Sequence, residues 1–481
     1  MAIASNNPKL IPVLATCLIV LTIVLIPFRI IGTGFLPADD ALRHAAKAVS
    51  GKAWDQILVL RDGINIDIHS GWHALLRVVY KAFNLNIYSL LIFSVVSLFV
   101  IFSLVPVMLL KRPEAWALSL IVMCVAQPYT AGRLLLGRPY LITMAVVVAI
   151  GCLWPHLAGK KPRYDIMASL AAGVAVATWT HGGWYFFIVP VSAFFLARQW
   201  LAGARIALTV AAGIIAGIVL TGHPVTFVTQ NLRLVFFAFS DYRLPRMLVP
   251  EIQPFLGDNV LVIAIILMLM WRAIRGDHNK KAVDDPVFMM AFVSWVAGFV
   301  TKRFWLDIGT AAALLWMATE FEAVLMKRFQ PASPKRLLSA AAISLVLFAA
   351  FTSDGMNRWS ANRPVSCLNF KAPQNASWAP GPGGTVYSSE IGLFHVMFFQ
   401  NPEAPWRYML GFEPGIMPPE DLAIYKNIKL RSDMASFEPW IRKLRPEDRL
   451  VVLNPSGETP KLKELEWYNP GNNVWIGRLK K

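Results

Sequence analysis

Residues 11–44 read IPVLATCLIVLTIVLIPFRIIGTGFLPADDALRH. The part before Gly32 is an apolar run that is long enough to cross about 30 Å of hydrocarbon as a helix. Asp39 and Asp40 follow it, where such a span would leave the membrane. Charge at a membrane boundary is costly unless it meets water, a cation or a substrate, so we expect a functional role for this pair. The structural alternative is a short helix that an Asp caps at its start and Gly51 stops at its end.

The composition of the 481-residue chain is that of a membrane protein. Apolar residues make up 56% of it and charged residues only 16%, which excludes a soluble globular protein of average make-up. Further apolar runs predict about eleven transmembrane helices, and hence an α-helical polytopic membrane protein. We place these spans near residues 11–32, 86–110, 114–131, 139–157, 166–181, 183–197, 204–221, 259–274, 286–301, 304–326 and 337–353.

Basic residues fall in alternate short loops and set the expected orientation. The positive-inside rule makes these loops cytoplasmic. They contain Lys111, Arg112, Lys160, Lys161, Arg163, Arg198, Arg205, Arg272 to Lys281 and Lys327 to Arg336. The N-terminus is then cytoplasmic, the first span is a retained anchor, and the loop 33–85 and the tail lie outside. Much of the net charge of +17 follows from this topology, so it gives no reason to expect a nucleic-acid partner.

Polar residues that can carry chemistry gather at the expected outer face. They are Asp39, Asp40, His44, Asp67, His69, His73, Arg133, Arg138, His181, His223, Asp241, Glu251, Lys302, Arg303 and Asp307. This placement suits a site at the outer leaflet, where water lies above and a lipid-borne group arrives through the hydrocarbon. A lipid or polysaccharide transporter, the first rival, would instead place ionisable residues at mid-membrane and show inverted repeats.

The order of these features resembles the GT-C class of integral membrane glycosyltransferases: one helix, an acidic pair in a long outer loop, many further helices and a C-terminal extracytoplasmic domain. Gly137-Arg138-Pro139-Tyr140 is similar to the Arg-Pro at a helix start in several bacterial members, and Gly384-Thr-Val-Tyr-Ser-Ser-Glu-Ile-Gly392 is similar to strands of their C-terminal domains. The resemblance implies transfer of a sugar from a polyprenyl-phosphate donor to a glycan, lipid or protein acceptor outside the cytoplasmic membrane. The second rival is an oligosaccharide ligase or oligosaccharyltransferase-like enzyme, which moves a whole glycan.

Such a transfer needs a carboxylate that takes the proton of the acceptor hydroxyl. Asp39 or Asp40 would fill this role. We rank Asp39 first, because adjacent helical residues point about 100° apart and only one can face the site squarely. The same geometry argues against both residues binding one metal ion unless the backbone there is irregular. The resemblance leaves cofactors open, since some members of the class need a divalent ion, and Mg²⁺ or Mn²⁺ would bind at Asp39 and Asp40.

The departing lipid phosphate calls for cations at the membrane surface. Lys302-Arg303 is the first candidate, because this pair breaks the positive-inside pattern. Its structural alternative is an outer turn in which Arg303 pairs with Asp307. Arg138, at a helix start, is the second phosphate candidate, while Arg133 could simply snorkel.

Further polar residues are candidates to line the substrate site. His181 stands before two glycines that let a ligand approach closely, although a tight turn between helices explains the same letters. Asp241 and Glu251 belong to the loop 222–258, which we expect to order over the donor or acceptor. The full set of substrate-lining candidates is His44, His181, His223, Asp241 and Glu251.

The stretch His69-Ser-Gly-Trp-His73 has the i, i+4 spacing that can chelate zinc from one helix face. However, no Glu lies between the two histidines and no third ligand is evident nearby. We therefore interpret the stretch as an interfacial segment of the first outer loop.

The chain changes character near Asp354 and becomes richer in Pro, Gly, Asn and charge. Strand-like runs lie at 384–388, 449–454 and 473–477, and residues 418–444 read as one or two helices. We expect a transmembrane catalytic domain over residues 1–353 and an extracytoplasmic α/β domain over residues 354–481. The second domain, at about 125 residues, is large enough to bury its own core.

Overall fold

The structure is a computed structural model, and it describes residues 9–37, 39–64, 67–240, 251–255, 259–276, 281–360 and 368–480. Packing divides the chain into two compact units. The first unit comprises Met1–Phe35, Val95–Gly222 and Arg246–Ala361, and the second comprises Leu36–Ser94, His223–Pro245 and Asn362–Lys481. The boundary at Ser94 falls inside helix α5 (Ile87–Leu109).

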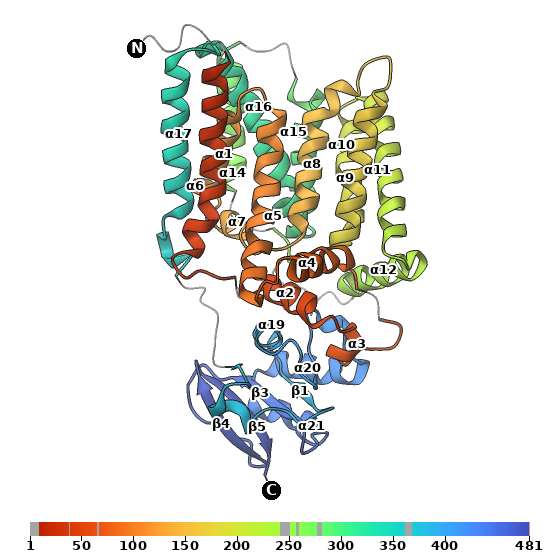
Figure 1. The fold of residues 1–481 in the computed structure, drawn as a ribbon. Helices are drawn as coiled ribbons and strands as arrows, with labels where there is room; N and C mark the ends of the chain where they lie inside the picture. Colours follow the sequence, from red (N-terminus) through yellow and green to blue (C-terminus); the bar gives the residue numbers. More distant parts are fainter. Residues whose placement is uncertain are drawn as a thin grey trace. The chain divides into compact units, whose positions relative to one another are not determined.

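The first unit is built from helices (Figure 1). Besides most of α5, they are α1 (Leu10–Ile31), α6 (Pro113–Ala126), α7 (Pro128–Arg133), α8 (Tyr140–Leu153), α9 (Tyr164–His181), α10 (Ile188–Leu196), α11 (Trp200–Leu220), α14 (Val260–Ile274), α15 (Pro286–Gly298), α16 (Thr310–Arg328) and α17 (Pro334–Thr352). Helix α1 packs against α17, α9 packs against α8 and α11, and α16 packs against α6.

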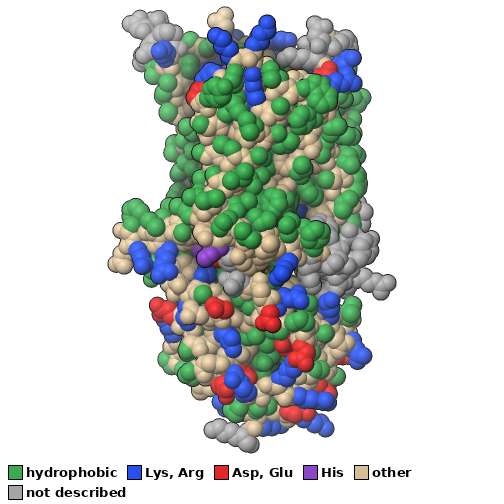
Figure 2. All heavy atoms as spheres, turned by 90° about the vertical axis from the view of Figure 1, so that its right-hand side faces the viewer, with side chains coloured by type: hydrophobic (Ala, Val, Ile, Leu, Met, Phe, Trp, Pro, Cys, Tyr) green, Lys and Arg blue, Asp and Glu red, His purple; other side chains and the backbone are tan. Residues whose placement is uncertain are grey.

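Among the described residues, five helices are long and apolar enough to cross a membrane: α1, α5, α11, α17 and the stretch Phe304–Arg328 that contains α16. Their surfaces carry large apolar side chains, such as Leu208, Ile215 and Val219 on α11, which are at least 60% exposed. Figure 2 shows hydrophobic side chains covering this face of the helical unit, with lysines and arginines gathered at one end of it. The protein is therefore a polytopic membrane protein, as the composition predicted.

Each apolar run that the sequence marked as a span overlaps a described helix, while the number of crossings stays a prediction. Three runs are less regular than expected. The run 114–131 breaks at Gln127, because Pro128 disfavours a helical conformation at the residue before it. The run 183–197 begins with a 3₁₀ turn, Trp184–Phe187, and the run 304–326 begins with a π-helical turn, Phe304–Gly309.

Two glycines allow α9 and α11 to pack closely. A Cβ atom on Gly213 would lie 2.6 Å from the carbonyl oxygen of Ala171, and one on Gly217 would lie 2.6 Å from that of Ala175. Small residues four apart are a common means by which membrane helices bring their backbones together. The contact fixes the end of α9, where the candidate residue His181 lies.

The second unit joins the first loop of the chain to its C-terminal part. Its helices are α2 (Asp40–Ser50), α3 (Trp54–Ile57), α4 (Ser70–Ala82), α12 (Pro224–Ser240), α18 (Pro373–Ala376), α19 (Ile391–Gln400), α20 (Pro419–Arg431) and α21 (Glu438–Ile441). The Val59 amide donates to the Tyr408 carbonyl at 2.9 Å, and the Arg61 amide donates to the Ile416 carbonyl at 2.8 Å. Helix α2 packs against both α4 and α19. The first loop therefore belongs to this unit by packing as well as by hydrogen bonds.

The described part of the second unit contains one mixed sheet with strand order β2-β1-β3-β5-β4 (Figure 1). Strand β1 (Thr385–Tyr387) is parallel to β2 (Arg407–Tyr408) and β3 (Arg449–Leu453), whereas β5 (Val474–Leu479) is antiparallel to β3 and to β4 (Leu465–Gly471). The three expected strand runs correspond to β1, β3 and β5. The strands β2 and β4 and the helix α19 were not expected. The sequence of α19, IGLFHVMFFQ, shows no amphipathic pattern because nearly all of its side chains are buried.

Candidate active site

The acidic pair of the first loop lies at the start of α2. Asp39 is the N-cap residue, and its side chain accepts a hydrogen bond from the Asp40 amide at 2.7 Å. Gly51 ends the helix in the left-handed region, with φ +61°. The short capped helix expected as the structural alternative is therefore present. Capping uses one oxygen of Asp39 and does not exclude a chemical role for either carboxylate.

His395 of α19 joins the acidic pair. One ligand atom from each of Asp39, Asp40 and His395 lies within 4.8 Å of the others, and His395 Nε2 is 3.7 Å from Asp40 Oδ1. The backbone at the acidic pair is irregular, which is the condition under which both carboxylates can bind one ion. Asp39 is extended, with φ −141° and ψ −157°, so the 100° rotation between successive helical residues does not apply. Two carboxylates and an imidazole are a donor set that divalent cations accept.

Arg43, one helical turn after Asp40, supplies the positive charge of this cluster. Its Nη2 and Nε atoms donate to Asp40 Oδ1 at 2.8 and 3.1 Å, and its guanidinium lies 4.3 Å above the centre of the Phe412 ring. The side chain is only 3% exposed. Its Nη1 atom is buried and has no hydrogen-bond partner among the residues that the structure describes. Such a donor costs about 1–3 kcal/mol if nothing satisfies it.

Histidines extend the cluster away from Asp40. Arg43 Nη2 lies 3.4 Å from His44 Nε2, His44 Nδ1 lies 2.8 Å from His73 Nε2, and His73 Nδ1 lies 2.5 Å from Asp67 Oδ2. Burial lowers the pKa of His44 and of His73 below its usual value. Burial alone would raise the pKa of Asp67, but its contact with His73 holds it well below its usual range. The imidazoles are therefore neutral and Asp67 is ionised at neutral pH.

Among the described residues, His69 is not part of a group of three potential metal ligands. His69 precedes α4 as its N-cap residue, and its ring packs edge-on against His44, with 4.9 Å between the ring centres. Burial lowers the pKa of His69 to about 3. Within the described residues, three potential metal ligands converge at Asp39, Asp40 and His395, and this group does not include His69.

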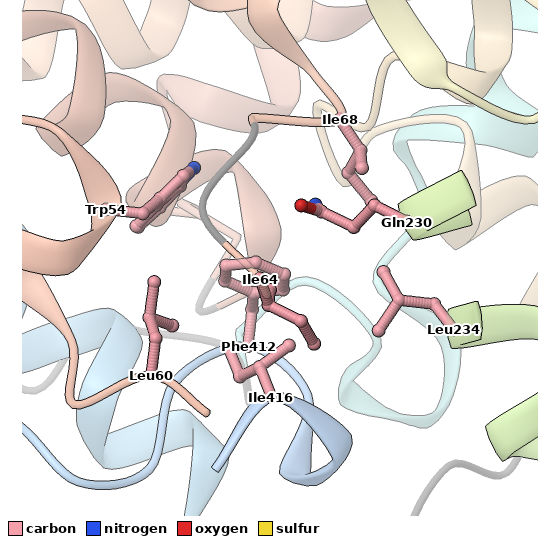
Figure 3. A pocket seen from close by; sticks show the side chains of 8 residues that line it. All are labelled: Trp54, Leu60, Ile64, Ile68, Gln230, Leu234, Phe412 and Ile416. Carbon is pink, nitrogen blue, oxygen red and sulfur yellow. The ribbon is translucent and has the colours of Figure 1, made fainter. Parts of the chain in front are cut away.

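The second unit also contains a pocket (Figure 3), two of whose lining residues contact this cluster. It is open to solvent, with about 280 Å³ of space when that opening is included, and is lined by Trp54, Leu60, Ile64, Ile68, Gln230, Leu234, Phe412 and Ile416. Phe412 is the ring under Arg43, and the Trp54 ring centre lies 6.0 Å from that of His73. The Gln230 side chain of α12 points its amide into the pocket. An apolar wall with few polar groups is the usual composition of a small-ligand site.

The first unit contains a separate cluster of arginines and carboxylates. Arg133 Nη2 donates to Asp307 Oδ1 at 2.7 Å, and Arg303 Nε donates to Asp307 Oδ2 at 3.1 Å. Glu251 pairs with both Arg133 and Arg138. Asp307 sits in the π-helical turn, a feature that is frequent at functional sites. Three arginines thus share two carboxylates, which leaves the cluster with a net positive charge.

The backbone holds the Glu251 segment against the Lys302-Arg303 turn. The Arg303 amide donates to the Glu251 carbonyl at 3.0 Å, and the Lys302 amide donates to the Gln253 carbonyl at 2.8 Å. Burial alone would raise the pKa of Glu251, but the guanidinium groups around it lower that pKa to about 2. Glu251 is therefore a counter-ion at neutral pH and is a poor proton acceptor.

The remaining candidates have mixed outcomes. Arg303 pairs with Asp307, as the structural alternative stated, and its Nη2 also lies 3.1 Å from His181 Nε2. His181 ends α9 before Gly182, which is left-handed with φ +69°, so the turn and the contact with the cluster are both present. His223 is exposed, and its carbonyl accepts the amide of Phe227 in α12. Asp241 lies outside the described residues.

Sequence reasoning missed or misjudged several residues of these clusters. Snorkelling, which the sequence left open for Arg133, does not occur: the side chain is 2% exposed and bound to two carboxylates. Arg43 could have been found from its i, i+3 spacing to Asp40, which suits an ion pair on a helix. The sequence around His395 gave no reason to expect a functional residue, because His395 is the only charged or titratable residue in an apolar run. The contact between Asp67 and His73 was also missed, because the sequence analysis considered only the i, i+4 spacing of His69 and His73. This contact depends on the path of the chain before α4.

Comparison of the sequence with family models and with curated proteins finds no match. Comparison of the structure finds ArnT from Cupriavidus metallidurans bound to undecaprenyl phosphate. It is 16% identical, with a TM-score of 0.57 over 96% of this chain and 97% of that one. The chain has the GT-C fold. The resemblance to the GT-C class that the sequence suggested is thus confirmed at the level of the fold.

A second solved structure also matches the fold. It is the archaeal oligosaccharyltransferase AglB from Archaeoglobus fulgidus, in complex with an inhibitory peptide and a dolichol-phosphate. The identity is 11% and the TM-score is 0.51, over 94% of this chain and 70% of that chain. Identities this low establish the GT-C fold and leave the reaction to be inferred from the site.

Proposed function

We propose that this protein is a membrane glycosyltransferase that transfers a sugar from a polyprenyl-phosphate donor to an acceptor hydroxyl at the outer face of the cytoplasmic membrane. The observation that carries the proposal is the convergence of Asp39, Asp40 and His395 beside the buried Arg43, in a chain with the GT-C fold. The donor class is inferred from ArnT, which is bound to undecaprenyl phosphate, and from AglB, which is in complex with a dolichol-phosphate.

In the proposed reaction, Asp39 takes the proton of the acceptor hydroxyl while its oxygen attacks the anomeric carbon of the donor sugar. The bond between that carbon and the phosphate oxygen breaks, and the lipid phosphate leaves with the electron pair. Asp39 is the proposed base, because Asp40 Oδ1 already accepts two hydrogen bonds from Arg43. The buried Nη1 atom of Arg43 donates to an oxygen of the substrate in this proposal.

A divalent ion at Asp39, Asp40 and His395 is the cofactor to test. The carboxylates suit Mg²⁺ and Mn²⁺ alike, whereas an imidazole ligand favours a first-row transition ion, so the donor set fits Mn²⁺ better. When bound, such an ion would neutralise negative charge that develops on the donor phosphate. Arg43 holds one Asp40 oxygen in place for this role.

The arginine cluster of the first unit is the proposed binding site for the lipid phosphate. Guanidinium groups bind phosphate through paired hydrogen bonds, and Lys302 adds a point charge. Arg138 and Arg303 are 18% and 30% exposed, so a ligand can reach them, whereas Arg133 is enclosed. The phosphate must compete with Glu251 for Arg138, so Glu251 sets the affinity of the site. Membrane lipids would surround the entry path.

The topology and the domain division belong to the same proposal. We propose about eleven spans, a cytoplasmic N-terminus and an outer position for the loop 33–85. We propose a catalytic transmembrane part over residues 1–353 and an extracytoplasmic α/β part over residues 354–481. The packing of α2 against α19 supports a role for the C-terminal part in the site.

A second candidate is an oligosaccharyltransferase-like enzyme that moves a whole glycan. The match to AglB favours it. The acceptor would then be an amide or hydroxyl of a protein or glycan, and the donor would carry a longer sugar chain. The carboxylate and arginine clusters serve either reaction, so donor choice separates the two candidates.

The test is transfer of radiolabelled sugar by the purified full chain in lipid vesicles. One arm offers polyprenyl-phosphate monosaccharides, and the other offers polyprenyl-pyrophosphate oligosaccharides, each with membrane extracts that contain glycan, lipid and protein acceptors. We expect transfer from the first class. Transfer only from the second would establish the oligosaccharyltransferase-like alternative, and no transfer from either would refute both.

A further inference from the structure

A continuous line of hydrogen bonds in the second unit runs from Asp67 to the acidic pair. It passes through His73, His44 and Arg43 and ends at Asp40 Oδ1, with successive distances of 2.5, 2.8, 3.4 and 2.8 Å. Arg43, His44 and His73 are at most 7% exposed. The path connects α4 to α2 and is therefore independent of the cap at Asp39.

The chemistry at the two ends allows only one direction of donation along this line. Arg43 has only donors, so the facing His44 Nε2 must be an acceptor. A neutral His44 then carries its proton on Nδ1 and donates it to His73 Nε2. His73 carries its proton on Nδ1 in turn and donates it to the carboxylate of Asp67, which accepts only while it is ionised. Both imidazoles are thus held in the Nδ1–H tautomer.

The orientation of Arg43 depends on this line. Its Nη1 atom has no hydrogen-bond partner in the described part of the chain, so the contacts that fix the guanidinium are Asp40, His44 and the Phe412 ring. Loss of His44 as an acceptor would leave Arg43 Nη2 with Asp40 as its hydrogen-bond partner among the contacts described above. A guanidinium that turned about its stem would no longer donate to Asp40 Oδ1 in the present geometry.

We propose that Asp67, His73 and His44 are positioning residues, which fix the tautomers of the line and so hold Arg43 and the Asp40 carboxylate in the geometry that sugar transfer requires. The role of these residues in sugar transfer rests on the proposed function, whereas the line of hydrogen bonds does not depend on it. Replacement of Asp67 by Asn is the informative change. An Asn side chain can present its NH₂ group to His73, which reverses both tautomers and sets His44 Nε2–H against an Arg43 N–H.

The first test observes the tautomers directly by nitrogen NMR of the purified full chain labelled at histidine. The chain has eight histidines, so the signals of His44 and His73 are assigned by difference from the variants His44→Gln and His73→Gln. We expect two imidazoles in the Nδ1–H form in the wild type and a mixture of the two tautomers in Asp67→Asn, because the Asn side chain can face His73 with either its oxygen or its NH₂ group. Nε2–H or doubly protonated rings in the wild type at neutral pH would overturn the proposal.

The second test measures transfer by two matched variants of His44. His44→Gln retains an acceptor close to the position of Nε2, and His44→Asn retains a donor close to that of Nδ1. Because Arg43 needs the acceptor, we expect His44→Gln to retain more activity than His44→Asn. We expect Asp67→Asn to lower kcat by about 10- to 100-fold with little change in the KM of the donor, as is typical when a supporting residue is lost. Asp67→Glu should restore part of the activity, and the exposed Asp62→Asn is the control.

The two tests separate the two proposals. Correct tautomers combined with wild-type kcat in Asp67→Asn and in both His44 variants would overturn the positioning role. Correct tautomers in a wild-type protein that transfers no sugar would instead refute the proposed function and leave the hydrogen-bond line established.

Discussion

Glu251 allows the energetics of the arginine cluster to be tested. Its carboxylate pairs with Arg133 and Arg138, which hold its pKa at about 2, against 4.5 for an isolated glutamate. Because the folded pKa is the lower one, the stabilisation is fully present above pH 4.5 and is lost as the pH falls toward 2. The difference corresponds to about 3 kcal/mol at neutral pH. Glu251→Gln should remove most of this stabilisation.

The assay is hydrogen exchange of the Lys302 and Arg303 amides, which donate to the carbonyls of Gln253 and Glu251. If the segment opens as a unit, a loss of about 3 kcal/mol raises its exchange about 100-fold. Glu251→Gln should also bind polyprenyl phosphate more tightly, because a competing anion is gone. Asp165→Asn, which removes an exposed partner of Arg163, is the control and should change neither property.

Exchange at the Lys302 and Arg303 amides that stays within about threefold of the wild type would refute the assigned magnitude. Weaker polyprenyl phosphate binding by Glu251→Gln would show that Glu251 supports the site rather than competing for it. These two results are independent, because the first reports on the folded segment and the second on the ligand.

Three further predictions concern stability. Gly217→Leu should destabilise the first unit by about 1–3 kcal/mol or more through overpacking against α9, measured by thermal unfolding in detergent with the exposed Leu208→Ala as control. Arg336→Met, which strands the buried Glu114, should cost about 3–5 kcal/mol in chemical unfolding, and adding Glu114→Leu should recover most of it. Lowering the pH from 7 to 5 should destabilise the second unit by about 2 kcal/mol through His69, whose pKa burial lowers to about 3, because the unfolded state binds the proton first; thermal unfolding against pH checks this.

The sequence was most informative where a feature depends on neighbouring residues. The first apolar run, the capped helix that ends at Gly51 and the Arg303–Asp307 pair could all be read from local pattern and spacing. Apolar runs also located the helices, because the hydrocarbon requires long apolar segments whatever their partners. The break at Gln127 was missed although Pro128 signals it, since hydropathy alone does not respond to proline.

Features that depend on tertiary contact could not be read in this way. His395 reaches Asp40 only because α19 packs on α2, and the run that contains it reads simply as buried. The side chains of Asp39 and Asp40 would point in different directions if both residues were helical, but Asp39, the cap residue, is extended. Burial of Arg133 required two carboxylates from distant segments, Glu251 and Asp307, which no local pattern links.

The most direct test of the central claim compares sugar transfer by the wild type, Asp39→Asn and Asp40→Asn in vesicles, at equal protein and with polyprenyl-phosphate binding confirmed for each. Loss of a general base commonly costs about 10²–10⁴ in rate. We predict a loss of at least about 100-fold for Asp39→Asn with lipid binding retained, and a smaller loss for Asp40→Asn. Wild-type transfer by both variants would contradict the account and reduce the acidic pair to the cap of α2.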